Sequence, residues 1–566
     1  MCGIFGGVGV NIEDTRQCLK HIRRGDDGIT VKQFDDVVIG ARRHLVKNSD
    51  KPGVTPGESD QPYASDDGSV QLVLNGELYT FVNIRSSLVE RGHTFTSTGD
   101  TEVFLRLYEE EGKDFVKNKM IDSLFAIAIL DRRSNELIIT RDWPGRIPLF
   151  YYYNKESRVF LFSSELKGLR ELDWVPLDDA IELTPGDIAT LDLETFELTV
   201  EPYFRPMPIK TNRNILEIGA DLNEVLKVSA RNRTMGDVPI CVMFSGGIDS
   251  ILTSFYVLNS IDFTLTDYKP TGYVFAVEDF VSEDVRRAQV AAEGFKEIGF
   301  ELKEIRAPRA TMIEDIPDVV ATFETRKIKA LSVYPLPIYY YLAPEMRKDG
   351  FKVTIGGHGV DELLGAYDAW KELTASHKVQ TNTKSRLMFM ASIYENMLRR
   401  ASIIFMNCGP IEARFPFLQP DVCEYMLGID SKWLNISAAN AETLARLMDD
   451  RGGPRNGWTD QMIEIHDYLV RYLDNGGEHP GEADEETRYE MEKLFWKLPM
   501  IVAGMHASQE SFLPVNVLFN AKLRGQHGAG ITDLETDIIN RFSDLGSTDG
   551  AIFQNIVNRA FRLKSV

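Results

Sequence analysis

Cys2 directly follows Met1 in the run Met-Cys-Gly-Ile-Phe-Gly-Gly over residues 1–7. If Met1 is removed, Cys2 becomes the first residue of the chain. Its thiolate can then attack a carbonyl carbon while its own α-amine, whose pKa is near neutral, carries the proton. The alternative is a small cysteine buried in a first strand. Other residues that suit the same chemistry would therefore favour a nucleophile at this position.

Asn75 and Gly76 follow an apolar strand expected over residues 71–74. Thiolate attack on an amide creates an oxyanion, which a side-chain amide and a backbone N–H can stabilise together. Asn-Gly is also common in tight turns, so the pair alone is not diagnostic. Arg43 and Asp100 could bind the carboxylate and the ammonium of a free amino acid, although the adjacent Arg42 leaves open which arginine does so.

A second candidate site is the run Ser-Gly-Gly-Ile-Asp-Ser at residues 245–250. It follows an apolar strand expected at 240–244 and precedes an apolar-periodic stretch at 251–258. Small residues at a strand-to-helix turn let backbone N–H groups meet phosphate oxygens, and Asp249 could reach a magnesium ion. The run lacks the lysine and the spacing of a Walker motif. It therefore predicts a nucleotide site of another kind.

The first two hundred residues predict an α/β sandwich that would position the first site. Helices are expected after Asp14, ending near Gly25, and from about Asp100 to Gly112. The short β-rich runs are typical of stacked antiparallel sheets and span residues 123–131, 136–140 and 158–162.

The pattern changes after an aperiodic segment from Tyr203 to Asn214, which we interpret as a linker. Strands expected at 240–244, 273–277, 301–305 and 351–355 alternate with helical stretches such as 283–298, which indicates a parallel sheet. Residues from about 431 to 488 predict a helical insertion with exposed loops at 451–457 and 475–486.

Composition excludes several classes of protein. The chain has 566 residues and a formal net charge of −22, so duplex nucleic acid is an unfavourable partner. Five cysteines without a CxxC pair disfavour a disulfide framework and a thiolate zinc site. No apolar run approaches the roughly 20 residues that a membrane helix needs, and no export signal is visible. We expect a cytoplasmic protein that does not contact membranes.

Residues of the first site, in their order, resemble the class II glutamine amidotransferase domain with an N-terminal nucleophile. The shared motifs are the opening Met-Cys-Gly-Ile-Phe-Gly, Arg24-Gly25-Asp26-Asp27, Asn-Gly-Glu-x-Tyr at 75–79 and Gly-Asp-x-Glu-Val at 99–103. Asp26 replaces the usual proline. The resemblance implies that Cys2 is the nucleophile, that Asn75 and Gly76 form the oxyanion hole, and that glutamine is bound by Arg43, Glu77 and Asp100.

The second half resembles the PP-loop ATP pyrophosphatases and, within them, the asparagine synthetases. Matching segments are Ser-Gly-Gly-Ile-Asp-Ser at 245–250, Gly-Gly-His-Gly-Val-Asp-Glu at 356–362, Glu-Ala-Arg-Phe-Pro-Phe-Leu at 412–418 and Met-Glu-Lys at 491–493. Together the two resemblances cover nearly the whole chain. They imply ATP and Mg2+ as cofactors, with glutamine and a carboxylate acceptor, aspartate or an analogue, as substrates.

By the same resemblance, particular residues of this chain take particular roles. ATP would be held by Ser245, Gly246, Gly247, Asp249, Ser250, Val274, Val277 and Gly357. Asp249 and Asp361 would share magnesium, and Lys493 would neutralise the departing pyrophosphate. Lys493 by itself could equally be a helix-surface lysine.

Four features depart from the asparagine synthetase pattern, all in the second half. His358 stands where that family has a catalytic glutamate, and an imidazole differs from a carboxylate in charge. The stretch after Phe323-Glu324-Thr325 lacks the usual aspartate-binding residues, Gln419 replaces an aspartate, and the 431–488 insertion is extra. We infer that glutamine hydrolysis and ATP activation are retained, whereas the acceptor need not be free aspartate.

The resulting hypothesis is a glutamine-dependent amidotransferase of two domains. Residues 1 to about 205 would form an αββα N-terminal-nucleophile hydrolase, and about 210 to 566 an α/β PP-loop domain, with a sheltered ammonia passage between them. Alternatives are a peptide, a sugar acid or a modified base as acceptor, a β-lactam-synthetase-like cyclase, or a non-catalytic regulator. A homodimer is also conceivable.

Overall fold

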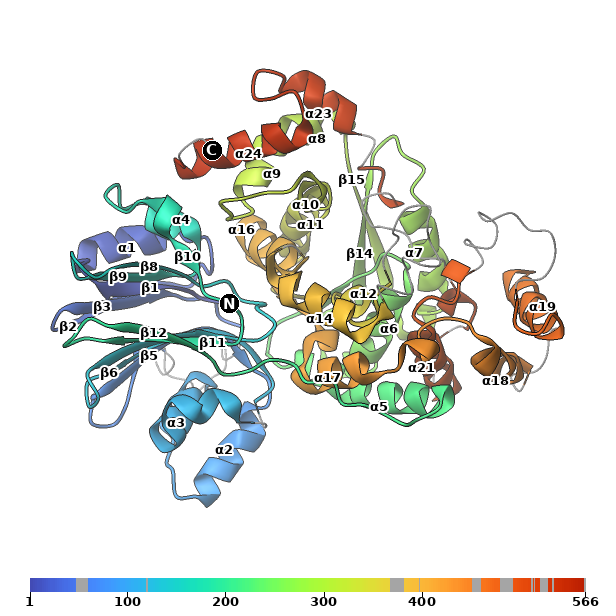
Figure 1. Cartoon of the computed structure of the whole chain (residues 1–566), viewed down its shortest axis with the longest axis horizontal. Helices are drawn as coiled ribbons and strands as arrows, with labels where there is room; N and C mark the ends of the chain where they lie inside the picture. Colours follow the sequence, from blue (N-terminus) through green and yellow to red (C-terminus); the bar gives the residue numbers. More distant parts are fainter. Residues whose placement is uncertain are drawn as a thin grey trace.

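The computed structural model describes residues 1–46, 60–118, 121–366, 381–395, 397–449, 460–478, 492–510, 513, 515–519, 528–531 and 534–563. Two stacked antiparallel sheets form the N-terminal domain, and a parallel sheet surrounded by helices forms the C-terminal domain beside it (Figure 1). This confirms the predicted fold class. Among the described helices, none combines the length and the apolar character needed to cross a membrane.

The first antiparallel sheet contains the start of the chain at its centre. Its strand order is β10-β8-β9-β1-β3-β2. The strands are β1 (Gly3–Val8), β2 (Ile29–Phe34), β3 (Val37–Arg42), β8 (Phe150–Asn154), β9 (Val159–Ser163) and β10 (Ile181–Glu182). Helices α1 (Ile12–His21) and α4 (Leu166–Arg170) cover its outer face (Figure 1). Residue 2 therefore lies at the beginning of a central strand.

The second antiparallel sheet has the order β12-β11-β7-β6-β5-β4. Its strands are β4 (Tyr63–Ala64), β5 (Val70–Leu78), β6 (Ser123–Asp131), β7 (Glu136–Arg141), β11 (Asp187–Asp192) and β12 (Leu198–Pro202). Helices α2 (Phe81–Glu90) and α3 (Thr101–Glu111) lie outside it (Figure 1). The αββα layering follows from apolar alternation, which buries one face of each sheet between the sheets and the other under helices.

The C-terminal sheet is parallel, with the order β15-β14-β13-β16-β17. The strands are β13 (Ile240–Met243), β14 (Thr271–Val277), β15 (Glu301–Ala307), β16 (Val353–Ile355) and β17 (Glu412–Arg414). Its order reverses at β13, between β14 and β16. Ligand sites of such sheets lie at the carboxyl ends of the strands near a reversal of this kind, and residues 245–250 follow β13 there.

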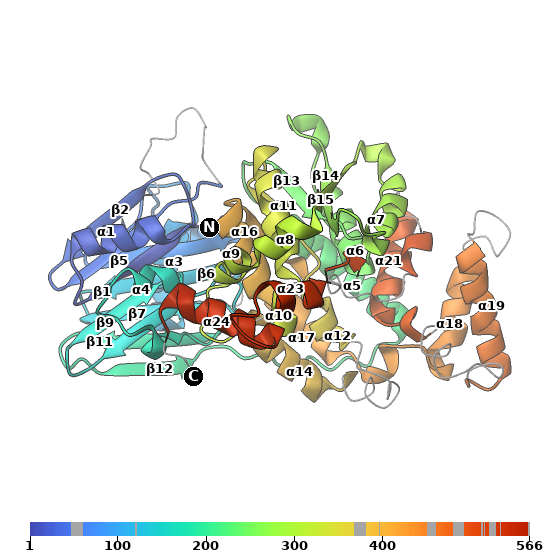
Figure 2. The same cartoon turned by 90° about the horizontal axis from the view of Figure 1, so that it is seen from above.

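Helices complete the C-terminal domain (Figures 1 and 2). They include α5 (Ile215–Arg233), α6 (Ile248–Leu258), α7 (Glu283–Glu293), α11 (Leu336–Lys348), α12 (Val360–Leu364) and α21 (Leu498–Glu510). The others are α8 (Arg309–Glu314), α9 (Ile316–Ala321), α10 (Ala330–Val333), α14 (Thr383–Ser392), α15 (Met397–Arg399), α16 (Phe405–Cys408), α17 (Pro420–Gly428), α18 (Ala438–Asp449), α19 (Asp460–Asp474), α23 (Glu535–Arg541) and α24 (Asp549–Phe561).

Element boundaries follow the sequence prediction closely in strands and less closely in helices. β6 has the predicted limits, whereas α1 begins at Ile12 under an Asn11 cap and ends at His21, before Gly25. The stretch predicted as one helix over 283–298 is α7 to Glu293, followed by a short 3₁₀ turn. Residues 203–214, expected as a linker, form neither helix nor strand. The loop at 451–457 and most of that at 475–486 lie outside the described residues.

A buried ion pair joins the two domains. Arg233, the last residue of α5, donates from Nη2 to Asp122 Oδ1 at 2.8 Å, and Nη1 bonds the other carboxylate oxygen. The side chain of Arg233 is fully buried and that of Asp122 is 5% exposed. Because neither charge can be hydrated, each depends on the other.

We predict that Asp122→Ala destabilises the protein by about 3–5 kcal/mol, because it leaves the Arg233 guanidinium buried without its carboxylate. The control is Asp114→Ala, which removes a 72% exposed partner of Lys117 and should cost about 1 kcal/mol or less. Thermal unfolding of both variants is the measurement. An unchanged melting temperature for Asp122→Ala would show that the pair does not hold the domains.

Candidate functional site

Cys2 lies where β1 begins, next to the end of β3. Its Sγ accepts a hydrogen bond from the backbone N–H of His44 at 3.4 Å. Burial raises the pKa of the Cys2 thiol, whereas the amine of residue 1 and the His44 N–H act in the opposite direction. Because burial prevails, the thiol needs a base to become nucleophilic.

Asn75 and Gly76 lie within β5, so the prediction that the strand ends at residue 74 is wrong. Asn75 is fully buried, and its Nδ2 donates to Ser164 Oγ at 3.1 Å. The same hydroxyl accepts the backbone N–H of Ile4 at 2.9 Å. One serine therefore connects the predicted oxyanion residue to the strand that begins beside Cys2.

Gly76 occupies a backbone position that excludes a side chain. Its φ is +156°, and a Cβ built on it would lie 2.1 Å from the carbonyl oxygen of Leu124 on β6. The strand can continue through this point because glycine alone fits. Although Asn-Gly is common in tight turns, sheet pairing with Phe125 determines the conformation here.

Two carboxylates, those of Glu77 and Asp100, lie near the end of β5. Asp100 Oδ2 accepts the backbone N–H of Leu78 at 2.8 Å. Glu77 is 8% exposed; burial raises its pKa well above the usual value, and the charges of Asp100 and Glu412 raise it further. The structure thus brings Glu77 and Asp100 together, as the sequence predicted for a glutamine site.

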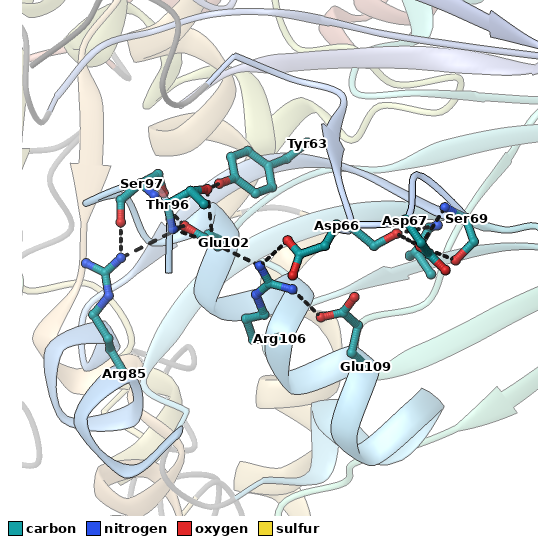
Figure 3. Close-up of polar contacts among 12 residues, drawn as sticks. Tyr63, Asp66, Asp67, Ser69, Arg85, Thr96, Ser97, Glu102, Arg106 and Glu109 are labelled. Atoms are coloured by element: carbon teal, nitrogen blue, oxygen red, sulfur yellow. Dashed lines mark hydrogen bonds and ion pairs between the residues drawn. The ribbon is translucent and has the colours of Figure 1, made fainter. Parts of the chain in front are cut away.

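The segment before Asp100 is held by a polar network (Figure 3). Glu102, in the first turn of α3, accepts the backbone N–H of Thr96 at 2.9 Å and of Ser97 at 2.6 Å. Arg106 binds Glu102 and, at 2.6 Å, Asp66. Burial opposes ionisation of Glu102, but these donors keep its pKa below the usual value. The network fixes the loop that delivers Asp100 to β5.

The two adjacent arginines have different environments. Arg42 donates to the backbone carbonyls of Gly25 at 2.6 Å and of Lys20 and Ile22 at 2.8 Å, so it joins β3 to the end of α1. Arg43 instead pairs with Asp60 and lies near enough to Cys2 to lower the pKa of its thiol. Arg43 is therefore the better candidate for a ligand-binding residue.

Residue 1 enters the C-terminal domain. Its α-amine lies 2.9 Å from Glu412 Oε2, and Arg414 Nε lies 2.7 Å from Glu412 Oε1, with all three groups fully buried. Burial alone would raise the pKa of Glu412, but the amine and Arg414 outweigh it and hold the pKa at about 2. The sequence marked Glu412 and Arg414 as part of a motif without indicating this contact with the chain start.

The PP-loop residues form the predicted strand-turn-helix between β13 and α6. Ser250 Oγ donates to the Gly247 carbonyl at 2.9 Å, and Ser245 Oγ lies 3.3 Å from Ser250 Oγ. Gly246 has φ +74°, and a Cβ there would lie 2.3 Å from the backbone nitrogen of Ala288. The turn therefore packs against α7 without room for a side chain.

A cavity of about 200 Å³ opens beside this turn. It collects most of the residues predicted for the nucleotide site: Ser245, Asp249, Ser250, Val274, Gly357, His358 and Asp361. Tyr339 of α11 also lines it, and its hydroxyl lies 2.9 Å from His358 Nε2. Val277 is buried and, among the described residues, does not line the cavity; its N–H donates to the Ala529 carbonyl at 3.0 Å.

Lys497 is the main residue of this site that sequence reasoning missed. Its Nζ bonds Asp249 Oδ2 and lies 2.7 Å from Asp361 Oδ1, with its side chain 3% exposed. Burial acts to lower the pKa of Lys497, but the two carboxylates prevail and raise it above the usual value. It lies just before α21, where no sequence spacing connects it to residues 249 or 361.

Lys493 is buried, and neither Lys493 nor Lys497 is among the described residues that line the cavity. Met491 of the same motif, and Tyr367 after Asp361, lie outside the described residues. The role predicted for Lys493 stays a prediction.

The stretch after Phe323, where the aspartate-binding residues of the asparagine synthetase pattern are missing, contacts the N-terminal domain. Glu324 is buried with φ +54°, and its carboxylate accepts the backbone N–H of Lys167 at 2.9 Å. The next residues, with Arg399 and Tyr394, line an interdomain cavity of about 950 Å³. Arg326 bonds the Asp178 carbonyl at its edge.

Comparisons with known proteins agree with this two-site arrangement. Residues 1–183 match the glutamine amidotransferase domain family, and residues 221–387 match the asparagine synthase family. Asparagine synthetase [glutamine-hydrolyzing] of Sandersonia aurantiaca is 26% identical over 80% of this chain and 84% of its own length. Asparagine synthetase [glutamine-hydrolyzing] 1 of Arabidopsis thaliana is 27% identical over 80% of this chain and 75% of its own.

We predict that Gly76→Ala destabilises the N-terminal domain by about 1–3 kcal/mol, because the added methyl group meets the backbone of β6 at a positive φ. Gly550→Ala in α24, where a Cβ meets nothing within 4 Å, is the matched control and should be neutral or stabilising. Melting temperatures of the two variants from thermal unfolding show whether the added methyl group at Gly76 destabilises the domain. Equal melting temperatures would contradict the steric account of Gly76.

Proposed function

We propose that this chain is a member of the asparagine synthetase family, with a glutamine amidotransferase domain followed by an asparagine synthase domain, and that it amidates a carboxylate with ammonia from glutamine at the expense of ATP. The observation that carries the proposal is the pairing of β16 with β17. Glu412 and Arg414 belong to β17, and Glu412 contacts residue 1. The neighbouring strand β16 leads to Gly357 and His358, which lie beside the PP-loop.

In the glutaminase half, the Cys2 thiolate attacks the side-chain amide of glutamine. The C–N bond breaks to release ammonia and leave a thioester, which water hydrolyses to glutamate. Asn75 Nδ2 and the Gly76 N–H stabilise the oxyanion. Arg43 binds the carboxylate of glutamine, and Asp100 and Glu77 bind its ammonium. Removal of Met1 would free the α-amine of Cys2 to act as the base that the buried thiol requires.

In the synthetase half, the acceptor carboxylate attacks the α-phosphorus of ATP to give an acyl-adenylate and pyrophosphate. The backbone of residues 245–250 and the two serine hydroxyls suit phosphate oxygens. Asp249 and Asp361 both pair with Lys497 Nζ, so the two carboxylates lie close enough together to fit a magnesium ion, which when bound would neutralise phosphate charge. Ammonia then attacks the acyl carbon and AMP leaves.

Lys497 suits the neutralisation of pyrophosphate as it departs. Its ammonium is kept charged by two carboxylates that line the cavity beside the PP-loop. A fixed cation in a dry site stabilises developing negative charge more than the same cation in water.

Two observations favour an acceptor carboxylate other than free aspartate. His358, bonded to Tyr339, brings no negative charge where the asparagine synthetase pattern has a glutamate. The Glu324 carboxylate is engaged by Lys167 of the N-terminal domain. A screen of carboxylates for ATP-dependent pyrophosphate release tests this preference, and strong stimulation by millimolar aspartate would contradict it.

We predict that Cys2→Ala abolishes glutamine-dependent activity but retains AMP formation when ammonium is supplied, because the substitution removes the thiolate and leaves the PP-loop intact. Glutamate and AMP are measured separately, with an acceptor found by the screen. Cys18→Ala, a change at a buried cysteine of α1, is the control and should keep both activities. AMP without glutamate in the unmodified chain would indicate a cyclase, and neither product a regulator.

We predict that Lys497→Ala lowers pyrophosphate release by about 10²–10³-fold, the usual effect of removing a preorganised charge partner from a transition state. Lys493→Ala is the matched control and should have a much smaller effect. Both are measured with ammonium, so that the glutaminase half is not tested. If Lys493→Ala lost more pyrophosphate release than Lys497→Ala, Lys493 would be the residue that neutralises the departing pyrophosphate.

A further inference from the structure

We propose that Asp26, Asp27 and His44 form a binding site for a zinc ion beside Cys2. One ligand atom from each residue, a carboxylate oxygen or a ring nitrogen, lies within 4.8 Å of the other two. Neither the glutamine chemistry nor the ATP chemistry proposed above uses the His44 ring. The cluster lies at the seam between the domains.

His44 supplies the observation that points to a ligand. Its side chain is fully buried, yet neither ring nitrogen has a hydrogen-bond partner among the described residues. Asp26 Oδ1 is 3.9 Å from Nδ1, which is too far for a hydrogen bond. An unsatisfied buried polar group costs about 1–3 kcal/mol, so a bound ion would remove a penalty that the fold otherwise carries.

The local backbone holds the two carboxylates beside the ring. The Asp27 N–H donates to the Arg43 carbonyl at 3.1 Å, and the Arg43 N–H donates to the Gly28 carbonyl at 2.8 Å. Gly25 makes this approach possible, because a Cβ there would lie 2.0 Å from the Arg43 oxygen. The turn from Gly25 to Gly28 is thus paired with the residue that precedes His44.

Zinc ligands lie about 2.0–2.2 Å from the ion, so tetrahedral ligand atoms are roughly 3.4 Å apart. The cluster would have to contract by about 1.4 Å at most, from the observed limit of 4.8 Å. The side chain of Asp26 is 41% exposed and has room to rotate, whereas that of Asp27 is 25% exposed and its Oδ2 accepts the Leu45 N–H at 2.7 Å. An imidazole with two carboxylates favours zinc over magnesium, which prefers six oxygen ligands.

Two cations of the C-terminal domain compete for the carboxylates. Arg347 lies 2.9 Å from Asp26 Oδ2, and Lys352 lies 3.8 Å from Asp27 Oδ2. Both pairs are partly exposed, and pairs of this kind contribute about 1 kcal/mol or less each. A zinc ion can therefore displace them, and its binding would release two contacts between the domains.

A zinc ion at this site would affect the reactivity of the Cys2 thiol. Cys2 Sγ accepts the backbone N–H of His44, so an ion on this cluster would lie close to a sulfur atom that zinc binds well as a thiolate. Zinc would then hold the thiolate and suppress its attack on a substrate carbonyl.

The test measures zinc binding to the full chain carrying Cys2→Ala, so that the nucleophile itself cannot account for binding. After removal of metal with a chelator, equilibrium dialysis against zinc sulfate should give one tightly bound zinc per chain. Adding Asp26→Asn or His44→Gln should weaken binding by at least about tenfold. Adding His93→Gln, which changes a histidine outside the cluster that pairs with Glu110, should not weaken zinc binding.

Asp26 is exposed, so Asp26→Asn keeps the test valid if His44→Gln fails to fold. The proposal is overturned if the Cys2→Ala chain binds no stoichiometric zinc, or if Asp26→Asn leaves the affinity unchanged. Because no turnover is measured, this outcome is independent of whether the proposed amidotransferase activity is found.

Discussion

The structure depends on a set of buried charges at the seam between the domains that must remain paired. Glu412 lies 2.7 Å from the Arg414 guanidinium, and both groups are excluded from water. Arg414 also donates to the carbonyl of Arg233, which in turn holds Asp122 of the N-terminal domain. Breaking any one link leaves a charge without hydration. The relative position of the two domains is therefore fixed by electrostatics as well as by apolar packing.

This constraint explains how two distant chemical sites can act together. Tyr79, just beyond the predicted oxyanion and glutamine residues, has Arg233 and Arg414 over its ring at 4.6 and 5.3 Å. β17, which carries Arg414, pairs with β16, and the Gly356 N–H donates to the Arg414 carbonyl at 3.0 Å. A continuous set of bonded groups thus runs from the end of β5 to the strand before His358. We propose that ammonia released beside Cys2 passes along this seam.

Elements whose conformation depends on residues close together in the chain could be predicted from the sequence. Apolar alternation gave β6 with its observed limits, and the small residues after β13 identified the PP-loop. Lys497 and His44 could not be found in this way, because their partners are far along the chain or depend on a turn that folds back onto β3. The extension of β5 through Gly76 was missed because strand pairing, rather than the Asn-Gly dipeptide, determines its backbone. Arg42 and Arg43 became distinguishable only once α1 showed which of them its carbonyls engage.

Mass spectrometry of the intact chain after treatment with an electrophilic analogue of glutamine tests the central claim most directly. The claim is that the start of the chain is a nucleophile placed against the synthetase domain. It predicts one equivalent of label on Cys2, in a chain whose first residue is Cys2. Retention of Met1 on the labelled protein, or a label on Cys18, Cys241, Cys408 or Cys423 instead, would contradict it.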